Sequence, residues 1–271
     1  MPEPGAVSAL DLSVVIPVYN EEENLAPLWD ELRGVLEGLR LHFEVVFVDD
    51  GSHDRSAEIV RGFREADPRV RLVRLKANAG ETAATDAGFK AARGRFIATM
   101  DADLQNDPAD LPALLGQLDT WDAATGWRVE RGAGDSWVRR LSSRAANGIR
   151  NAISDETIHD SGCTYRAFRR ECLRDLTLYR GFHRFIPTLL RMRGFRVVEV
   201  PVRNRPRRFG QSKYGIMNRA FVAFADLLVV RWMKSRLLRS EVAEDLEGRI
   251  SRDATALPGR PEPRRVWGAR G

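Results

Sequence analysis

The first half of the chain alternates short apolar runs with segments whose apolar residues recur at helical spacing. Four runs have the length and β-branched content of strands: 12–18, 43–48, 70–75 and 95–100. The segments between them each carry one apolar face typical of a helix: 22–39, 55–66 and 81–92. This alternation predicts an α/β fold built on a mostly parallel, doubly wound sheet.

The second half alternates less regularly. Its apolar runs predict three further strands, at 122–127, 163–169 and 196–202. Its helical patterns predict helices at 136–153, 183–193 and 216–238, and a basic loop with Gly and Pro lies at 203–215. The predicted organisation is a disordered N-terminus at 1–10, one domain over 11–215, an amphipathic helix at 216–239 and a disordered tail at 240–271.

Composition narrows the class of protein. The chain has 271 residues, of which 43% are hydrophobic, enough for a well-filled core. Its two cysteines, Cys163 and Cys172, are too few for a disulfide framework and fit a reducing compartment. The N-terminus lacks the pattern of a signal peptide, and no run of eighteen apolar residues occurs, so we expect no membrane-spanning helix.

Charge is distributed unevenly along the chain. Residues 166–239 carry 19 basic and 4 acidic side chains, whereas the remainder carries 24 basic and 34 acidic ones. A strongly basic part predicts an anionic partner. Nucleic acid, anionic lipid and phosphorylated substrates all satisfy this observation.

Acidic segments follow three of the predicted strands. They are YNEEEN at 19–24, DDGSHD at 49–54 and DADLQND at 101–107. Because ligands bind outside the carboxyl ends of the strands in open α/β sheets, these segments are candidate binding loops. A dinucleotide fold would place a G-x-G-x-x-G loop after its first strand, and a P-loop protein would carry a Walker A sequence. Neither motif is present, which excludes both readings.

The third acidic segment has the composition of a metal site. Asp101 and Asp103 are two residues apart, and Gln105 can add a neutral oxygen. Such ligands suit Mg²⁺ or Mn²⁺, with substrate phosphates completing the coordination. The alternative is that Asp103 and Asp107 only cap the following helix, with Pro108 in its first turn. Three acidic strand ends on one edge favour the metal over capping.

Five motifs occur together in a fixed order. They are VVIPVYNEEENL, VFVDDGSHDRS, NAGETAATDAGFKAARG, MDADLQNDP and RFGQSKYG. In this order they resemble family 2 glycosyltransferases of the dolichyl- or polyprenyl-phosphate sugar synthase type, over about residues 11–235. The resemblance implies a GT-A-type nucleotide-diphospho-sugar transferase fold, with 11–215 as its catalytic domain.

The resemblance also implies roles for residues after the first strands. Asp101, Asp103 and Gln105 would bind the metal and the diphosphate, with Ala102 packed against the nucleotide. The nucleoside pocket would be lined by Pro17, Tyr19, Glu21, Val48 and Asp50. The alternative for Asp50 is a simple Asp-Gly turn with Gly51.

Five basic side chains supply the expected anion site. Guanidinium groups suit phosphate oxygens, so the resemblance implies that these residues hold a lipid phosphate or the departing diphosphate. The residues are Arg128, Arg140, Arg144, Arg208 and Lys213. Each alone would be read as a solvated surface charge. We expect no nucleic-acid binding, because Phe209 and Tyr214 are too few interleaved aromatics.

Asp160 is the second catalytic candidate beside Asp103. It matches a position where related enzymes carry an acid near the acceptor, so it could act as a general base. A phosphate acceptor has a second pKa of about 6 and is already nucleophilic at neutral pH. Asp160 would then orient the arginines instead.

The implied reaction transfers a hexose from a nucleotide-diphosphate sugar to a polyprenyl phosphate, with inversion at the anomeric carbon. This is chemistry of the dolichyl-phosphate mannosyltransferase-like kind. Two alternatives stay open: a family 2 enzyme with a soluble or glycan acceptor, and a non-catalytic module that binds anionic lipid. The sugar, the choice of GDP or UDP, the lipid length and the oligomeric state stay open as well.

Three residues or segments depart from the family pattern or carry a second reading. Glu81 stands where a neutral or amide residue is common beside the nucleotide, and His183 is interpreted as a packing or surface residue. The helix at 216–238 either lies at a membrane interface or packs on the domain. We expect peripheral attachment to the cytoplasmic face of the membrane.

Overall fold

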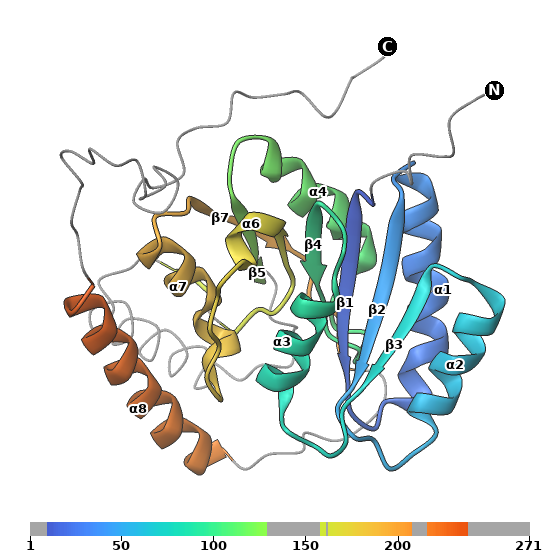
Figure 1. Cartoon of the computed structure of the whole chain (residues 1–271), viewed down its shortest axis with the longest axis horizontal. Helices are drawn as coiled ribbons and strands as arrows, with labels where there is room; N and C mark the ends of the chain where they lie inside the picture. Colours follow the sequence, from blue (N-terminus) through green and yellow to red (C-terminus); the bar gives the residue numbers. More distant parts are fainter. Residues whose placement is uncertain (1–9, 129–157, 161, 208–215, 238–271) are drawn as a thin grey trace, which may run out of the picture.

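A computed structural model describes residues 10–128, 158–160, 162–207 and 216–237. Its centre is a seven-stranded sheet in the order β3-β2-β1-β4-β6-β5-β7 (Figure 1). The strands are β1 (Leu12–Val18), β2 (Phe43–Asp49), β3 (Val70–Arg74), β4 (Phe96–Thr99), β5 (Ala123–Arg128), β6 (Arg166–Arg169) and β7 (Val197–Val202). Only β6 runs antiparallel to its neighbours among these strands. The mostly parallel α/β prediction is confirmed.

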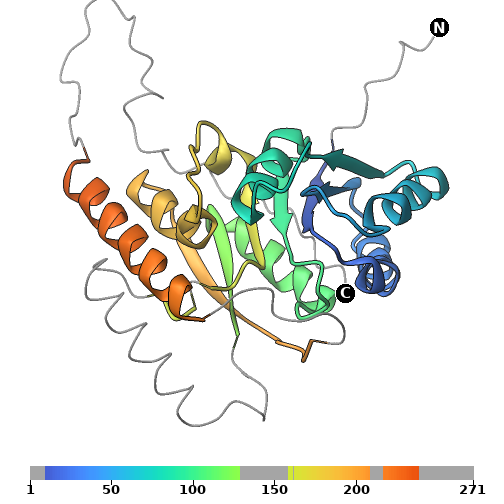
Figure 2. The same cartoon turned by 90° about the horizontal axis from the view of Figure 1, so that it is seen from below.

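Helices cover both faces of the sheet (Figures 1 and 2). One face packs against α1 (Glu22–Gly38), α2 (Ser56–Ala66) and α4 (Leu111–Gly116). The other packs against α3 (Glu81–Ala91), α6 (Arg170–Leu173) and α7 (Ile186–Met192). Three short 3-10 helices are also present: η1 (Pro108–Asp110), η2 (Gln117–Asp119) and η3 (Phe182–Phe185). The last described helix is α8 (Ile216–Ser235).

Burial on both faces explains why the central strands are continuously apolar. Along β1, Val14 and Ile16 join the core under α1, whereas Val15 joins the core under α3. A strand with period-two side chains can be apolar at every position only when both faces are covered. The apolar runs of the sequence therefore located the strands well.

The second half differs from its prediction in detail. The expected strand at 163–169 is confined to β6, because Cys163 to Tyr165 form an irregular approach to it. The expected helix at 183–193 is divided into η3 and α7 at Ile186. The expected helix at 136–153 lies outside the described residues.

Gly88 sets the distance between α3 and the sheet. A Cβ atom at this position would lie 2.2 Å from Val15 Cγ1 and 3.1 Å from Val48 Cγ2. We expect Gly88→Ala to destabilise the fold by about 1–3 kcal/mol, because the core must shift to admit a methyl group. Urea unfolding measures this difference. Gly62→Ala, at a position with open space around it, is the matched control and should not destabilise.

Candidate functional site

The carboxyl ends of β1, β2 and β4 meet at one edge of the sheet, because these strands are parallel neighbours. The three acidic segments therefore lie side by side, as the sequence predicts. Backbone hydrogen bonds continue this arrangement past the strands: Asp50 N donates to Val18 O, and Met100 N donates to Val15 O. This edge is the candidate site.

The segments after β1 and β2 are tied together. The backbone NH of Asn20 donates to Ser52 Oγ at 3.0 Å, and that of Glu21 donates to Ser56 Oγ at 2.9 Å. Asn20 Oδ1 accepts from the His53 NH at 2.8 Å, and Asn20 adopts a left-handed φ of 53°. The rings of Tyr19 and His53 lie in a T-shaped arrangement, with their centroids 6.4 Å apart. These contacts fix the wall that Tyr19 and Glu21 form.

Asp50 and Val48 lie deeper than a ligand-contacting residue usually does. The Asp50 carboxylate accepts from the backbone NH groups of Ala79 at 2.7 Å and Gly80 at 2.9 Å. Val48 is fully buried in the core beside Val15. The Asp-Gly turn is also present, since Gly51 has a φ of 71°. Val48 is thus part of the core, and Asp50 holds the segment that leads into α3.

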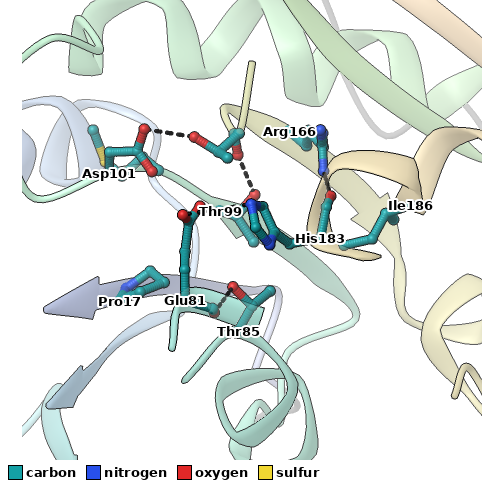
Figure 3. Close-up of a pocket in the computed structure, with 10 residues that line it drawn as sticks. Pro17, Glu81, Thr85, Thr99, Asp101, Arg166, His183 and Ile186 are labelled. Atoms are coloured by element: carbon teal, nitrogen blue, oxygen red, sulfur yellow. Dashed lines mark hydrogen bonds and ion pairs between the residues drawn. The ribbon is translucent and has the colours of Figure 1, made fainter. Parts of the chain in front are cut away.

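Asp101 faces a small cavity at the end of β4 (Figure 3). Its Oδ2 accepts from Thr164 Oγ1 at 2.6 Å, and its backbone NH donates to Asn106 Oδ1 at 2.9 Å. Burial of the Asp101 carboxyl and the nearby charge of Asp103 raise its pKa to about 6. A cation bound beside Asp101 would offset the burial and the nearby negative charge that disfavour its ionised form.

The capping alternative applies to Asp107 and is wrong for Asp103. Asp107 Oδ1 accepts from the Ala109 NH at 3.0 Å, and Pro108 takes the first position of η1. Asp103 instead accepts from the Gln105 NH at 3.1 Å and pairs with Arg207 Nη2 at 2.7 Å. Asp103 therefore keeps its carboxylate on the edge of the site.

Three arginines at every second position join the segment after β7 to the Asp101–Asp110 loop through ion pairs. Arg203 pairs with Asp107 at 3.0 Å and with Asp110 at 2.8 Å, and Arg205 pairs with Asp107 at 2.7 Å and with Glu31. Arg207 pairs with Asp103. The backbone NH of Arg205 also donates to Gln105 O at 2.9 Å. Our sequence reasoning missed these residues, although their period of two in RNRPR is the signal of one face of an extended segment.

Asp160 and Arg128 form a bidentate ion pair at the end of β5. Arg128 Nε and Nη2 donate to the two Asp160 oxygens at 2.6 and 2.9 Å. Asp160 is 3% exposed. The guanidinium is desolvated, yet the Asp160 carboxylate raises the pKa of Arg128 above its ordinary value, so the guanidinium stays charged. The other predicted anion ligands, Arg140, Arg144, Arg208 and Lys213, lie outside the described residues.

The cavity beside Asp101 also contains residues that our sequence reasoning did not assign to the site. Thr164, Arg166 and His183 line it together with Glu81 and Pro17 (Figure 3). Arg166 is 2% exposed and donates to the His183 carbonyl. The His183 side chain is 16% exposed, so it packs as expected while also lining the cavity.

The residues at this edge provide some, but not all, of the ligands that a divalent cation needs. Asp101 and Asp103 supply carboxylate oxygens, the ligands that Mg²⁺ and Mn²⁺ prefer. Within the described ranges, no group of three or more His, Cys, Asp or Glu side chains could hold a metal by itself. A cation here would therefore depend on oxygens from a ligand, as Mg²⁺ commonly does with substrate phosphates.

Comparison with known proteins identifies the family. The sequence pattern of "Glycosyl transferase family 2" matches residues 13–177, more than half of the chain. The chain belongs to glycosyl transferase family 2.

It is 37% identical to dodecaprenyl-phosphate galacturonate synthase of Rhizobium johnstonii over 229 residues, 83% of this chain and 67% of that protein. It is 38% identical to undecaprenyl-phosphate 4-deoxy-4-formamido-L-arabinose transferase of Edwardsiella ictaluri over 207 residues, 76% of this chain and 63% of that protein. The chain thus spans about two thirds of the length of these relatives.

Solved structures support the GT-A-like fold of this family 2 chain. Glucosyl-3-phosphoglycerate synthase of Mycobacterium tuberculosis, in complex with Mn²⁺, UDP and phosphoglyceric acid, matches with a TM-score of 0.63 at 20% identity. The match covers 85% of this chain and 80% of that one. At this identity the likeness shows the fold alone.

Proposed function

We propose that this chain transfers a sugar from a nucleotide-diphosphate sugar to a polyprenyl phosphate, giving a lipid-phosphate-linked sugar. The names of its relatives, which act on dodecaprenyl and undecaprenyl phosphate, support this acceptor class. The observation that carries the proposal is the Asp101–Asp103 pair at the carboxyl end of β4. These two carboxylates could bind a divalent cation, and the cation could in turn bind a diphosphate at this edge of the sheet.

Sheet order provides a layout for the reaction. We assign the nucleoside to the ends of β2 and β1, around Tyr19, Glu21 and Pro17, above Val48 and Asp50. The diphosphate follows at the end of β4, beside Asp101, Ala102 and Asp103. The acceptor phosphate lies farther along, at Arg128 on β5. The sheet order β2-β1-β4-β6-β5 supports this sequence of subsites.

A divalent cation, Mg²⁺ or Mn²⁺, held by Asp101 and Asp103 with Gln105, would neutralise charge that develops on the leaving diphosphate. An oxygen of the acceptor phosphate attacks the anomeric carbon opposite the diphosphate. The new carbon–oxygen bond forms as the bond to the diphosphate breaks, which inverts the configuration. Arg128 balances the acceptor charge, and Asp160 holds the guanidinium in place. Arg140, Arg144, Arg208 and Lys213 are proposed to assist it.

An acceptor panel tests this proposal. The purified chain is incubated with metal and a mixture of nucleotide sugars, together with polyprenyl phosphate, polyprenol or a soluble glycan, and products are identified by mass spectrometry. We expect a product only with polyprenyl phosphate, at the mass of the lipid phosphate plus one sugar residue. A product with polyprenol or glycan, and none with the phosphate, would contradict the proposed acceptor.

Metal-dependent donor binding should depend on pH through Asp101. The pKa of Asp101 in the folded chain is about 6, above its ordinary value. Without metal, protonated Asp101 therefore adds to the free energy of unfolding. This contribution is complete below about pH 4 and is lost as the pH rises through 6, because the buried carboxyl then ionises. Donor binding with metal needs the ionised form, so affinity should be about tenfold weaker at pH 5 than at pH 7.

Calorimetric titration with a nucleotide sugar at pH 5, 6 and 7 measures this effect, because the diphosphate diester does not titrate in that range. Thr164→Val removes a hydrogen bond that lowers the pKa of Asp101, so it should move the profile to higher pH. Equal metal-dependent affinity at all three pH values would contradict the assignment of Asp101.

We propose that α8 attaches the chain to the cytoplasmic face of a membrane. Both Figures 1 and 2 show α8 beside α7, at the side away from α1. Leu227 and Val230 are buried against η3 and α7, whereas Phe224, Leu228 and Trp232 are 45%, 46% and 61% exposed. One face of this helix packs on the domain, and the proposed membrane contact is assigned to the exposed one. No helix in the described part of the chain is long and apolar enough to cross a bilayer.

Changing the exposed face of α8 should weaken membrane binding. We expect the double variant Leu228→Ser/Trp232→Ser to bind vesicles with anionic lipid at least about tenfold more weakly, because two large apolar side chains no longer enter the interface. Vesicle co-sedimentation measures this change. Tyr179→Ser, a 56% exposed aromatic outside α8, is the control and should bind as wild type does. Binding of the double variant as tight as that of Tyr179→Ser would contradict the proposal.

A further inference from the structure

Arg207 forms an ion pair with Asp103, one of the two candidate metal ligands. Its Nη2 donates to Asp103 Oδ2 at 2.7 Å, while Asp103 Oδ1 accepts from the Gln105 NH at 3.1 Å. The Asp103 side chain is 13% exposed and the Arg207 side chain is 36% exposed. Both oxygens of this carboxylate therefore already have a hydrogen-bond donor, and one of the two donors carries a full positive charge.

Contacts of the preceding residues hold Arg207 beside Asp103. The Arg205 NH donates to Gln105 O at 2.9 Å, and the Arg205 side chain pairs with Asp107 at 2.7 Å. Arg207 follows Arg205 by two positions, so it lies on the same face of this extended segment. These contacts keep the backbone of Arg207 next to the Asp101–Asp110 loop when the ion pair with Asp103 opens.

A divalent cation on Asp103 meets this guanidinium as a like charge. The cation either displaces Arg207 from Asp103 Oδ2 or binds close to it, and both cost binding free energy. Because Arg207 is partly exposed, water and salt screen the repulsion, and the cost corresponds to about five- to tenfold in affinity. Arg128 and Arg166 also act on Asp101, but their charges are the same in every variant compared below.

The diphosphate of a bound donor would change this balance. Its negative charges beside the cation offset the repulsion between the cation and the guanidinium. Phosphate oxygens also offer Arg207 a charge-assisted hydrogen bond in exchange for the one to Asp103. Arg207 therefore opposes the cation when the donor is absent and stabilises the complex that contains both ligands.

We infer that Arg207 couples metal binding to donor binding, because it competes with the cation for Asp103 until the donor diphosphate pairs with the guanidinium. The inference rests on the proposed function, which assigns the cation and the diphosphate to this edge of the sheet. It adds a property to that function: the cation binds tightly only together with the donor. By thermodynamic linkage, each of the two ligands strengthens the binding of the other by the same factor.

Two binding measurements on Arg207→Gln test this coupling without using activity. The first is Mn²⁺ binding to the whole chain without nucleotide, followed by the signal of free Mn²⁺ in electron paramagnetic resonance. The variant should bind Mn²⁺ at least about fivefold more tightly than wild type. The second is calorimetric titration with UDP-glucose and with GDP-mannose at saturating Mn²⁺. Here the variant should bind the donor at least about fivefold more weakly, because no guanidinium meets the diphosphate.

Three further variants serve as controls. Arg207→Lys keeps the positive charge and should bind Mn²⁺ within about twofold of wild type. Arg203→Gln removes one charge from the same segment, but its partners are Asp107 and Asp110, so both affinities should stay within about twofold of wild type. Asp103→Asn should bind Mn²⁺ at least about tenfold more weakly, which assigns the measured ion to this site.

Weaker or unchanged Mn²⁺ binding by Arg207→Gln, or unchanged donor binding, would overturn the inference while the proposed function stands. Equal changes in Arg203→Gln would attribute the effect to the whole segment and would overturn the inference as well. Absence of Mn²⁺-dependent binding of both nucleotide sugars by wild type would overturn the proposed function too, so the two failures are distinguishable.

Discussion

Asp103→Asn is expected to lower kcat/KM for sugar transfer by at least about a thousandfold. The amide matches the carboxylate in size but lacks the charge that would hold a divalent cation against the diphosphate. The loss should appear mainly in kcat, since charge on the leaving group is greatest in the transition state. The measurement is transfer of labelled sugar to polyprenyl phosphate at saturating metal.

The control for this variant is Asp30→Asn on α1, an exposed carboxylate whose neutralisation should leave kcat/KM unchanged. The thermal midpoint of Asp103→Asn should stay close to that of wild type, because the ion pair with Arg207 is near the surface and contributes little. A folded Asp103→Asn chain that transfers sugar at the wild-type rate would show that the metal is not held there.

Asp160→Asn is expected to reduce kcat/KM for the acceptor about tenfold and not to abolish transfer. The asparagine leaves Arg128 in place but weakens its bidentate hold, so the guanidinium is less well directed at the acceptor phosphate. Steady-state kinetics with varied polyprenyl phosphate measure the change, and Arg128→Lys should show a loss of similar kind because it cannot pair through two nitrogens.

Complete loss of transfer in Asp160→Asn, with the fold intact, would identify Asp160 as a general base. That result would favour a hydroxyl acceptor, which needs a proton removed, over a phosphate acceptor. The existing geometry favours orientation, because both Asp160 oxygens already accept from Arg128. Glu31→Gln, which changes a carboxylate paired with Arg205, provides a comparison outside the acceptor side.

The parallel strands were predictable because each is short, apolar and covered on both faces. β1 and β2 match their predicted positions within one residue, and the acidic segments after β1, β2 and β4 meet at the expected edge. Local pattern carries this information. The antiparallel insertion of β6 between β4 and β5 has no such local signal, because it depends on which strands pair.

Contacts between distant segments were the part that the sequence did not reveal. Arg207 and Asp103 are 104 positions apart, and Thr82 and His183 are 101 apart. No pattern in one sequence pairs such residues, so the sequence indicates only positive charge for the arginines of 203–207. Their pairing with the Asp101–Asp110 loop joins the proposed metal site to the segment that leads toward Arg208 and Lys213.

The buried state of Asp50 and Val48 has the same origin. Sequence position placed both at strand ends, where ligands bind, but the Asp50 carboxylate accepts from Ala79 and Gly80, and Val48 packs in the core under α3. Motif position therefore predicts which edge of the sheet carries these segments, and tertiary contacts determine which side chains face the cavity.

The most direct test of the central claim is transfer of radiolabelled sugar into extractable polyprenyl phosphate by the purified chain. GDP-mannose, UDP-glucose and UDP-N-acetylglucosamine are each supplied with Mg²⁺ or Mn²⁺ and, in parallel, with chelator. We predict label in the lipid phase from at least one donor, only when metal is present, and none with Asp103→Asn. Label that enters lipid equally well with chelator, or no label from any donor, would contradict metal-dependent sugar transfer at this site.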